Sequence, residues 1–169
     1  FHQSGYEVTV LGRGHVSAAL LRSRAVEVEL TDGWEMDRFL VPVRTVDLTD
    51  RRAAVRAVST ADVVGTAVGA RMLPEVLIAE GLERAARPVN LIAFENHENA
   101  ARIIRKGLRT RLGSVVDRHG FTGAVIARAV AQRVFAEDGR VRVVGDRPSE
   151  VVLDGTALVD PVPLVQDFI

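Results

Sequence analysis

The segment spanning residues 61–96, "ADVVGTAVGARMLPEVLIAEGLERAARPVNLIAFEN", indicates how this chain folds. Two short apolar runs, "ADVVGTAVG" and "PVNLIAFEN", are typical of buried strands, and a segment with helical periodicity lies between them. Pro74 is compatible with this helix because it falls in the first turn. A strand, a helix and a second strand in this order predict a mostly parallel sheet with helices on both faces, and therefore an α/β fold.

The same alternation continues on both sides of this segment. We expect strands at residues 6–11, 25–30 and 40–48, with one wet, acidic face on the second strand and Pro42 at an edge or bend. Helices are expected at residues 15–24, 50–60 and 97–112, the second one capped by Thr49 or Asp50. The apolar side of the last helix is predicted to comprise Ala100, Ile103, Ile104 and Leu108.

Beyond Gly113 the pattern changes to a series of short strands. These are expected within residues 120–135, 140–145, 149–155 and 157–165, with a hairpin turn at "EDGR", residues 137–140. We therefore predict a single domain over residues 1–169, with a core at 1–117 and a strand-rich extension at 118–169. Because the chain begins with Phe1 rather than Met, it is expected to be a fragment or a processed product.

The composition excludes several classes of function. Lys and Arg number 22, and so do Asp and Glu, which gives no overall attraction to nucleic acid or to an anionic membrane. The longest apolar runs are too short to span a bilayer. The absence of cysteine excludes disulfides, thiolate metal sites and a cysteine nucleophile. We expect a cytoplasmic protein without nucleic-acid or membrane partners, in which lone histidines such as His119 lie on the surface.

Two strand ends are candidate ligand sites, because ligands of open α/β sheets bind beyond the carboxyl ends of the strands. Residues 66–69, "TAVG", carry small side chains that let a flat ligand approach the backbone. A plain strand-to-helix turn is the alternative. In "FENHEN", residues 94–99, Asn96 could donate to a substrate oxygen, and Glu95 or His97 could act as acid or base. The alternative is a helix cap provided by Asn96, with Glu98 in the first turn.

These motifs together resemble a known family. Residues 61–96, "GFTGAVIARAV" and "SGYEVTVL" are similar to the cofactor domain of mannitol-1-phosphate 5-dehydrogenase and related long-chain polyol dehydrogenases. The resemblance implies a Rossmann-like dinucleotide-binding domain that uses NAD(P) for hydride transfer between a sugar alcohol, or its phosphate, and a ketose. It also implies a catalytic Asn96 beside the reacting carbonyl, and cofactor contacts from Thr66, Ala67, Val68, Gly69 and Glu95.

The chain departs from the family pattern at three places. The family's first strand with its glycine-rich loop is expected before Phe1, and its helical domain with the catalytic lysine is expected after Ile169. The family's acidic residue, which holds the ribose hydroxyls of the cofactor, falls at Gly12 here. The neighbouring Arg13 would favour the 2′-phosphate of NADP. The aspartate of a later family motif falls near Ala127.

The stretch at residues 8–21, "VTVLGRGHVSAALL", has two interpretations. Gly12 and Gly14, with Asp32 twenty residues after Gly12, resemble a pyrophosphate-binding loop and its ribose-binding acid. However, the following helix is short and the third fingerprint position is Ser17. The family comparison makes this stretch the second strand, which places Gly12 and Arg13 beside the adenosine ribose.

Two other functions remain open from sequence. One is a degenerate nucleotide-fold module that binds without turnover. The other is a phosphate-sensing regulator that uses the arginine-rich segment at residues 102–111. Strand edges left exposed by a missing first strand would favour self-association.

Overall fold

The computed structural model describes residues 5–68, 75–95, 97–126, 130–135, 140–147 and 151–160. The chain forms two compact units, each built from two segments. Unit 1 comprises Phe1–Asp50 with Ile126–Glu150, and unit 2 comprises Arg51–Val125 with Val151–Ile169. Strands β7 and β10 join the sheet of unit 2 and β8 and β9 join a sheet of unit 1, so the segment after residue 118 contributes to both units.

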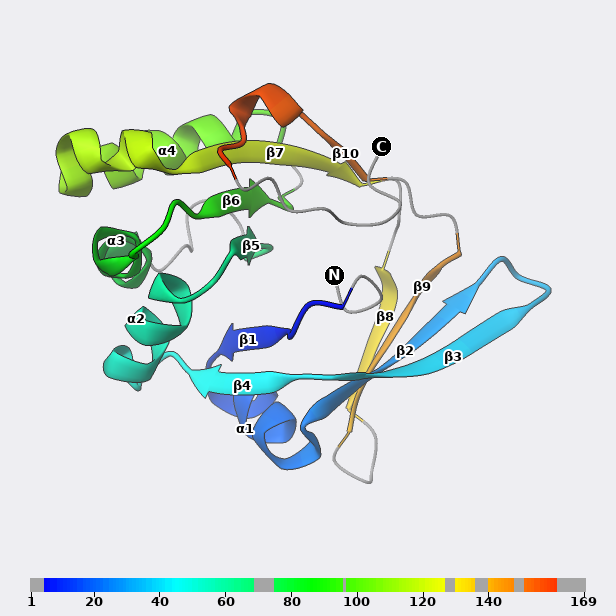
Figure 1. Ribbon diagram of the computed structural model, residues 1–169. Coiled ribbons are helices and arrows are strands. Elements are labelled where there is room, and N and C mark those ends of the chain that lie inside the picture. Colours follow the sequence, from blue (N-terminus) through cyan, green and yellow to red (C-terminus); the bar gives the residue numbers. More distant parts are fainter. Residues whose placement is uncertain are drawn as a thin grey trace. The chain divides into compact units, whose positions relative to one another are not determined.

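Unit 1 contains one helix and two small sheets (Figure 1). One sheet pairs the short strands β1 and β4 in parallel, and the other has the order β3-β2-β9-β8. In the second sheet β2 and β9 are parallel, whereas the β2–β3 and β8–β9 pairs are antiparallel. The elements of unit 1 are β1 (Thr9–Gly12), α1 (Gly14–Ser23), β2 (Ala25–Thr31), β3 (Met36–Pro42), β4 (Arg44–Asp47), β8 (Val130–Phe135) and β9 (Val141–Asp146).

The local sequence explains where β3 and α1 end in unit 1. Pro42 ends β3, which is an edge strand of its sheet, so the missing amide proton costs no ladder hydrogen bond. Arg24 terminates α1 in a left-handed conformation, φ 54°, and its amide donates to the Leu20 carbonyl at 2.8 Å. A small core forms where α1 meets the strands, comprising Ala19, Leu20, Val43 and Val141.

The acidic side of β2 is not the wet face that its alternating sequence predicts. Glu29 is only 5% exposed, and its carboxylate accepts from Arg38 Nε on β3 at 2.6 Å. Arg142 on β9 bonds to Glu27 at 3.0 Å and also lies 3.4 Å from Glu29. The strands on either side therefore supply cations that cover these two carboxylates, which the sequence of β2 alone does not reveal.

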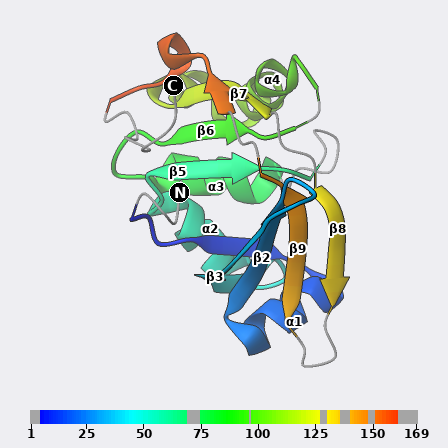
Figure 2. The same cartoon turned by 90° about the vertical axis from the view of Figure 1, so that its right-hand side faces the viewer.

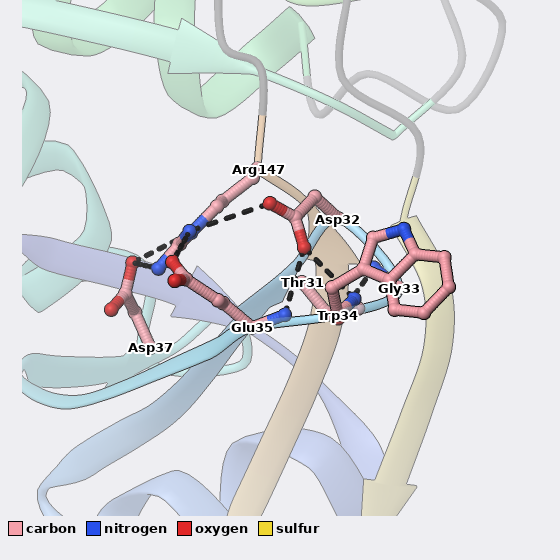
Figure 3. A network of polar contacts seen from close by, with 7 residues as sticks. All are labelled: Thr31, Asp32, Gly33, Trp34, Glu35, Asp37 and Arg147. Carbon is pink, nitrogen blue, oxygen red and sulfur yellow. Dashed lines mark hydrogen bonds and ion pairs between the residues drawn. The ribbon is translucent and has the colours of Figure 1, made fainter.

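The hairpin turn between β2 and β3 is fixed by one arginine (Figure 3). Within the turn, Asp32 accepts from the amides of Trp34 and Glu35, both at 2.9 Å. Arg147, just after β9, reaches the carboxylates of Asp32, Glu35 and Asp37. Asp32 thus serves a hairpin turn, and the interpretation that made it the ribose-binding acid of a pyrophosphate loop is wrong.

Unit 2 has a four-stranded sheet of order β10-β7-β6-β5, in which β5, β6 and β7 are parallel (Figure 2). The predicted alternation of strand and helix is confirmed here. Its elements are α2 (Arg51–Ser59), β5 (Val63–Thr66), α3 (Glu75–Arg84), β6 (Asn90–Ala93), α4 (Ala100–Leu112), the 3-10 helix η2 (Gly113–Arg118), β7 (Gly120–Ile126), β10 (Val151–Leu153) and the 3-10 helix η3 (Gly155–Ala157).

Strand β6 lies at the centre of the core of unit 2. All four of its residues are buried, and because successive side chains point to opposite faces, both faces of the sheet are covered at this strand. Helix α4 buries Ala100, Ile104 and Leu108 as predicted, whereas Ile103 is 43% exposed and does not join the apolar side. Helices α2 and α3 pack so closely that a Cβ at Gly81 would lie 2.4 Å from Val58.

The last described segment differs from the expected strand at residues 157–165. Helix η3 ends at Ala157, no strand follows up to Asp160, and the remaining residues lie outside the described part of the chain. The segment is attached to β6 by the buried Asn90 side chain, which accepts from the Val159 amide and donates to the Val159 carbonyl, both at 2.9 Å. The turn predicted at residues 137–140 also lies largely outside the described residues, although the antiparallel β8–β9 pair on its flanks is confirmed.

Candidate functional site

The carboxyl ends of β5 and β6 meet at one edge of the sheet in unit 2. The two strands are parallel with Thr66 opposite Ala93, so the loops that follow them leave the sheet at the same edge (Figure 2). The pairing extends one step further, because the Phe94 amide donates to the Thr66 carbonyl at 2.8 Å. The two segments that the sequence singled out therefore begin side by side.

A carboxylate connects the two strand ends. Glu95 Oε1 accepts from the Val68 amide at 3.0 Å, which holds the loop after β5 against the loop after β6. Ala67 and Val68 are exposed, and Glu95 is half-buried. The structure thus brings together four of the predicted site residues, namely Thr66, Ala67, Val68 and Glu95, whereas Gly69 and Asn96 lie outside the described residues.

The hydroxyl of Thr66 is buried and makes no hydrogen bond to a described residue. The residue is 4% exposed, and its Oγ1 has no hydrogen-bond partner in the described part of the chain. A buried hydroxyl without a partner is costly, so a group that supplies the missing bond would be stabilising. Beside it, the Phe94 ring covers Gly65 so closely that a Cβ there would lie 3.1 Å from the ring.

His97 shapes the entry into α4. Its Nδ1 accepts from the Asn99 amide at 3.1 Å, and its carbonyl accepts from the Ala100 amide at 3.0 Å. Asn99 itself makes no side-chain capping bond. With Nδ1 used as an acceptor, only Nε2 of His97 is left to exchange a proton with a ligand.

Unit 1 has its own edge at the carboxyl ends of β1 and β4. Gly12 stands opposite Asp47 in the parallel register, and the Leu48 amide donates to the Gly12 carbonyl at 2.8 Å. Arg13 follows in an extended conformation, φ −145° and ψ 161°, with an exposed side chain that pairs with no acid among the described residues. Gly14 then begins α1 with a φ of 69°.

The sequence analysis missed Asp47 as a candidate for this edge. Its Oδ1 accepts from both the amide and the hydroxyl of Thr49, at 2.8 and 2.7 Å, and these bonds hold the pKa of Asp47 below its usual value. The Ser17 hydroxyl, buried beneath Gly12, lowers that pKa further, although Ser17 Oγ is not within hydrogen-bond geometry of any described atom. The sequence offers one signal, an acid at a strand end with threonine two residues later, but Asp154 and Thr156 show the same pattern.

Other candidate groups are structural. His119 is 3% exposed rather than on the surface, its Nδ1 accepts from the Val89 amide at 3.2 Å, and burial lowers its pKa. Within the described ranges, no three acidic or histidine side chains converge in a way that could hold a metal ion. No helix among the described residues is both long and apolar enough to cross a lipid bilayer.

Comparison with known sequences agrees with the motifs. The chain is 28% identical to mannitol-1-phosphate 5-dehydrogenase of Brevibacillus brevis over 179 residues, which cover 97% of this chain and 45% of that protein. The enzymes of the same name from Shouchella clausii and Neosartorya fischeri are each 30% identical, over 75% and 76% of this chain. The family resemblance is confirmed. The chain spans less than half of the length of these relatives, and no protein-family model matches it.

Solved structures of dehydrogenases have a similar fold. The mannitol 2-dehydrogenase of Pseudomonas fluorescens, solved as a ternary complex with NAD and D-mannitol, matches 89% of this chain with a TM-score of 0.73 at 12% identity. A structure of octopine dehydrogenase with NADH and L-arginine matches 93% with a TM-score of 0.54 at 19% identity. The chain covers 43% and 38% of these structures, respectively. The Rossmann-like α/β fold predicted from the sequence is thereby confirmed.

Proposed function

We propose that this chain is the cofactor-binding part of an NAD(P)-dependent polyol or polyol-phosphate dehydrogenase of the cytoplasm. The observation that carries the proposal is the edge formed by β5 and β6. There, family-matched residues surround the buried hydroxyl Thr66 Oγ1, which has no hydrogen-bond partner among the described residues. Sequence similarity over most of the chain to mannitol-1-phosphate 5-dehydrogenases supports the substrate class. A bound nicotinamide dinucleotide would supply the hydride acceptor at this edge.

The residues at the edge have distinct roles in this proposal. Ala67 and Val68 are exposed and apolar, which suits contact with the face of a planar ring. Glu95 keeps that surface in place through the Val68 amide. Thr66 offers its hydroxyl to a polar atom of the cofactor. Gly69 and Asn96 lie outside the described residues; from the family motif, Gly69 is proposed to contact the cofactor and Asn96 to donate to the oxygen of the reacting carbonyl. The acid–base lysine is contributed by a helical domain of the longer protein.

In unit 1, Gly12 and Arg13 are proposed to contact the adenosine ribose. A glycine in place of the family acid leaves no carboxylate at that position to repel a phosphate. The exposed Arg13 supplies a cation that suits a 2′-phosphate, so we propose a preference for NADP.

The proposal is tested by titrating the chain with NAD, NADP and the free nicotinamide mononucleotide while recording heat or fluorescence. We expect saturable binding of the dinucleotides, with NADP binding more tightly than NAD. Thr66→Val should weaken binding, and Thr110→Val, which alters an exposed hydroxyl on α4, should not. Failure of both dinucleotides to bind would refute the cofactor role, and tighter binding of NAD would refute the NADP preference alone.

The degenerate binding module is the second candidate. The observation that favours it is the glycine at the position of the family's ribose-binding acid. Turnover of mannitol 1-phosphate by a protein that contains this segment together with a lysine-bearing helical domain would exclude this alternative. Self-association through exposed strand edges is compatible with either function, and sedimentation over a range of concentrations tests it.

A further inference from the structure

We propose that Asp47 recognises the adenine base of the cofactor by accepting a hydrogen bond from its exocyclic amine. This inference rests on the proposed function and assigns a role to a residue outside the family-matched motifs. It concerns only the edge formed by β1 and β4 in unit 1.

The first step is the placement of Asp47. It is the last residue of β4, and the parallel register sets it directly opposite Gly12, the last residue of β1. Neighbouring strands lie about 4.8 Å apart. A ligand whose ribose contacts Gly12 and Arg13 therefore places its attached base within reach of the adjacent strand end. Because Gly12 has no side chain, Asp47 supplies the carboxylate of this residue pair.

The second step is the state of the carboxylate. Oδ1 is held by the amide and hydroxyl of Thr49, so the side chain has one orientation before any ligand arrives. Both hydrogen bonds from Thr49 reach Oδ1, and Asp47 is only half-buried, which leaves Oδ2 within reach of a ligand. The buried Ser17 hydroxyl faces the same carboxylate without a hydrogen-bond partner of its own. The edge thus contains an oriented anion whose second oxygen can accept a hydrogen bond from a ligand.

The third step is the chemistry of the ligand group. An ionised carboxylate only accepts hydrogen bonds, so it selects a group that donates one. The exocyclic amine is the only donor on the Watson–Crick edge of an adenine base. Hypoxanthine has an acceptor oxygen at that position and its donor at the adjacent ring N1, so a carboxylate held in one orientation opposite the amine meets the oxygen instead. Asp47 therefore favours adenine over hypoxanthine, whereas Arg13 acts on the ribose or its phosphate.

The experiment compares NAD with nicotinamide hypoxanthine dinucleotide in titrations of the complete chain. A hydrogen bond to a charged group is worth about 1.5–3 kcal/mol, so we expect NAD to bind on the order of tenfold more tightly or better. In Asp47→Asn, which retains the shape of the side chain, the amide can donate to the hypoxanthine oxygen. The preference for NAD should therefore shrink to about twofold or reverse.

The chain provides a matched control. Asp154 accepts from the amide and hydroxyl of Thr156, at 3.0 and 2.6 Å, in the same Asp-x-Thr turn, but it belongs to unit 2. Asp154→Asn should leave the preference for NAD unchanged. Circular dichroism of both variants verifies that they fold, and the wild-type preference is measurable without any variant.

The outcomes separate the two proposals. If NAD binds without preference over the hypoxanthine analogue, or if Asp47→Asn leaves the preference intact, the role of Asp47 is refuted while the cofactor role stands. The same titrations include the NAD analogue that lacks the 2′-hydroxyl of the adenosine ribose. If the wild type prefers NAD over this analogue and Asp47→Asn removes that preference, the carboxylate contacts the ribose and the assignment to the base is wrong. If no dinucleotide binds, both proposals fall.

Discussion

The two units of this chain are stabilised in different ways. Unit 2 has a fully buried central strand, β6, and buries most of the large apolar side chains, among them Leu82, Leu91, Ile92 and Ile104. Unit 1 has a small apolar core around Leu20, and its mixed sheet carries carboxylates and arginines across neighbouring strands. The difference shows that a parallel sheet covered on both faces is held by apolar packing, whereas a mixed sheet with a polar face needs paired charges.

The largest expected effect is a cavity in the core of unit 2. Leu91→Ala removes a side chain that is 0% exposed on β6, and we expect a loss of about 3 kcal/mol in the free energy of unfolding. Hydrogen exchange of backbone amides measures the loss separately in each unit. Exchange in β6 should accelerate strongly, and exchange in β2 should change little. Equal acceleration in both strands would mean that the units unfold together.

The next effect tests how tightly α2 and α3 pack. A Cβ at Gly81 would lie 2.4 Å from the buried Val58, so Gly81→Ala should cost about 2 kcal/mol although alanine favours helices. Gly107→Ala is the matched control. Its new Cβ would meet only the flexible end of Glu75, and we expect a gain of up to about 1 kcal/mol. Chemical unfolding of both variants measures the difference, and equal effects would contradict the close packing of α2 and α3.

In unit 1, a substitution at the buried Glu29 tests whether paired charges stabilise the mixed sheet. Glu29→Gln removes the charge that faces Arg38 and Arg142, and we expect a loss of about 1–2 kcal/mol, moderated because both arginines reach solvent. Asp37→Asn, at an exposed carboxylate of the hairpin, is the control and should cost less. Hydrogen exchange in β2 and β3 reports the loss. An unchanged exchange rate in Glu29→Gln would show that charge pairing does not stabilise this sheet.

The smallest effect compares the two Asp-x-Thr turns, one in each unit. Hydrogen bonds from Thr49 and from Thr156 lower the pKa values of Asp47 and Asp154, respectively. A carboxyl with a lowered pKa in the folded state stabilises the protein above its unfolded pKa of about 3.8, and this contribution is lost as pH falls further. We therefore expect Asp47→Asn and Asp154→Asn to have lower midpoint temperatures of thermal unfolding than wild type near pH 7. The difference should disappear by about pH 2.5. A constant gap at all pH values would contradict this linkage.

Sequence patterns predicted unit 2 better than unit 1. The apolar runs around residues 63–66 and 90–93 are nearly continuous, which is what burial on both faces requires, and the strands form where expected. In unit 1 the alternation in β2 correctly predicted a strand, but it could not show that Arg38 and Arg142 would cover the acidic side. Arg38 lies 9 residues after Glu29, and Arg142 lies 113 residues after Glu29 and 115 after Glu27. A pattern within β2 therefore cannot predict these ion pairs.

The sequence predicted only part of the candidate sites. Thr66, Ala67, Val68 and Glu95 were found because they follow apolar strands and match a family motif. Asp47 was not found because its interest depends on the parallel register with Gly12, which joins strands 35 residues apart along the chain. Even the Asp-x-Thr pattern was insufficient, since the same three-residue turn at Asp154 lies outside this edge.

The sequence by itself determined the α/β class, the family resemblance and the local turns, because apolar periodicity, glycine and proline positions and short side-chain-to-backbone bonds act over a few residues. The tertiary structure alone decided how the strands of the carboxyl-terminal segment divide between two units. It also decided which carboxylates are paired with arginine and which one lies opposite Gly12 at a strand end. These outcomes depend on the pairing of distant strands, and that pairing is set by the packing of the whole chain.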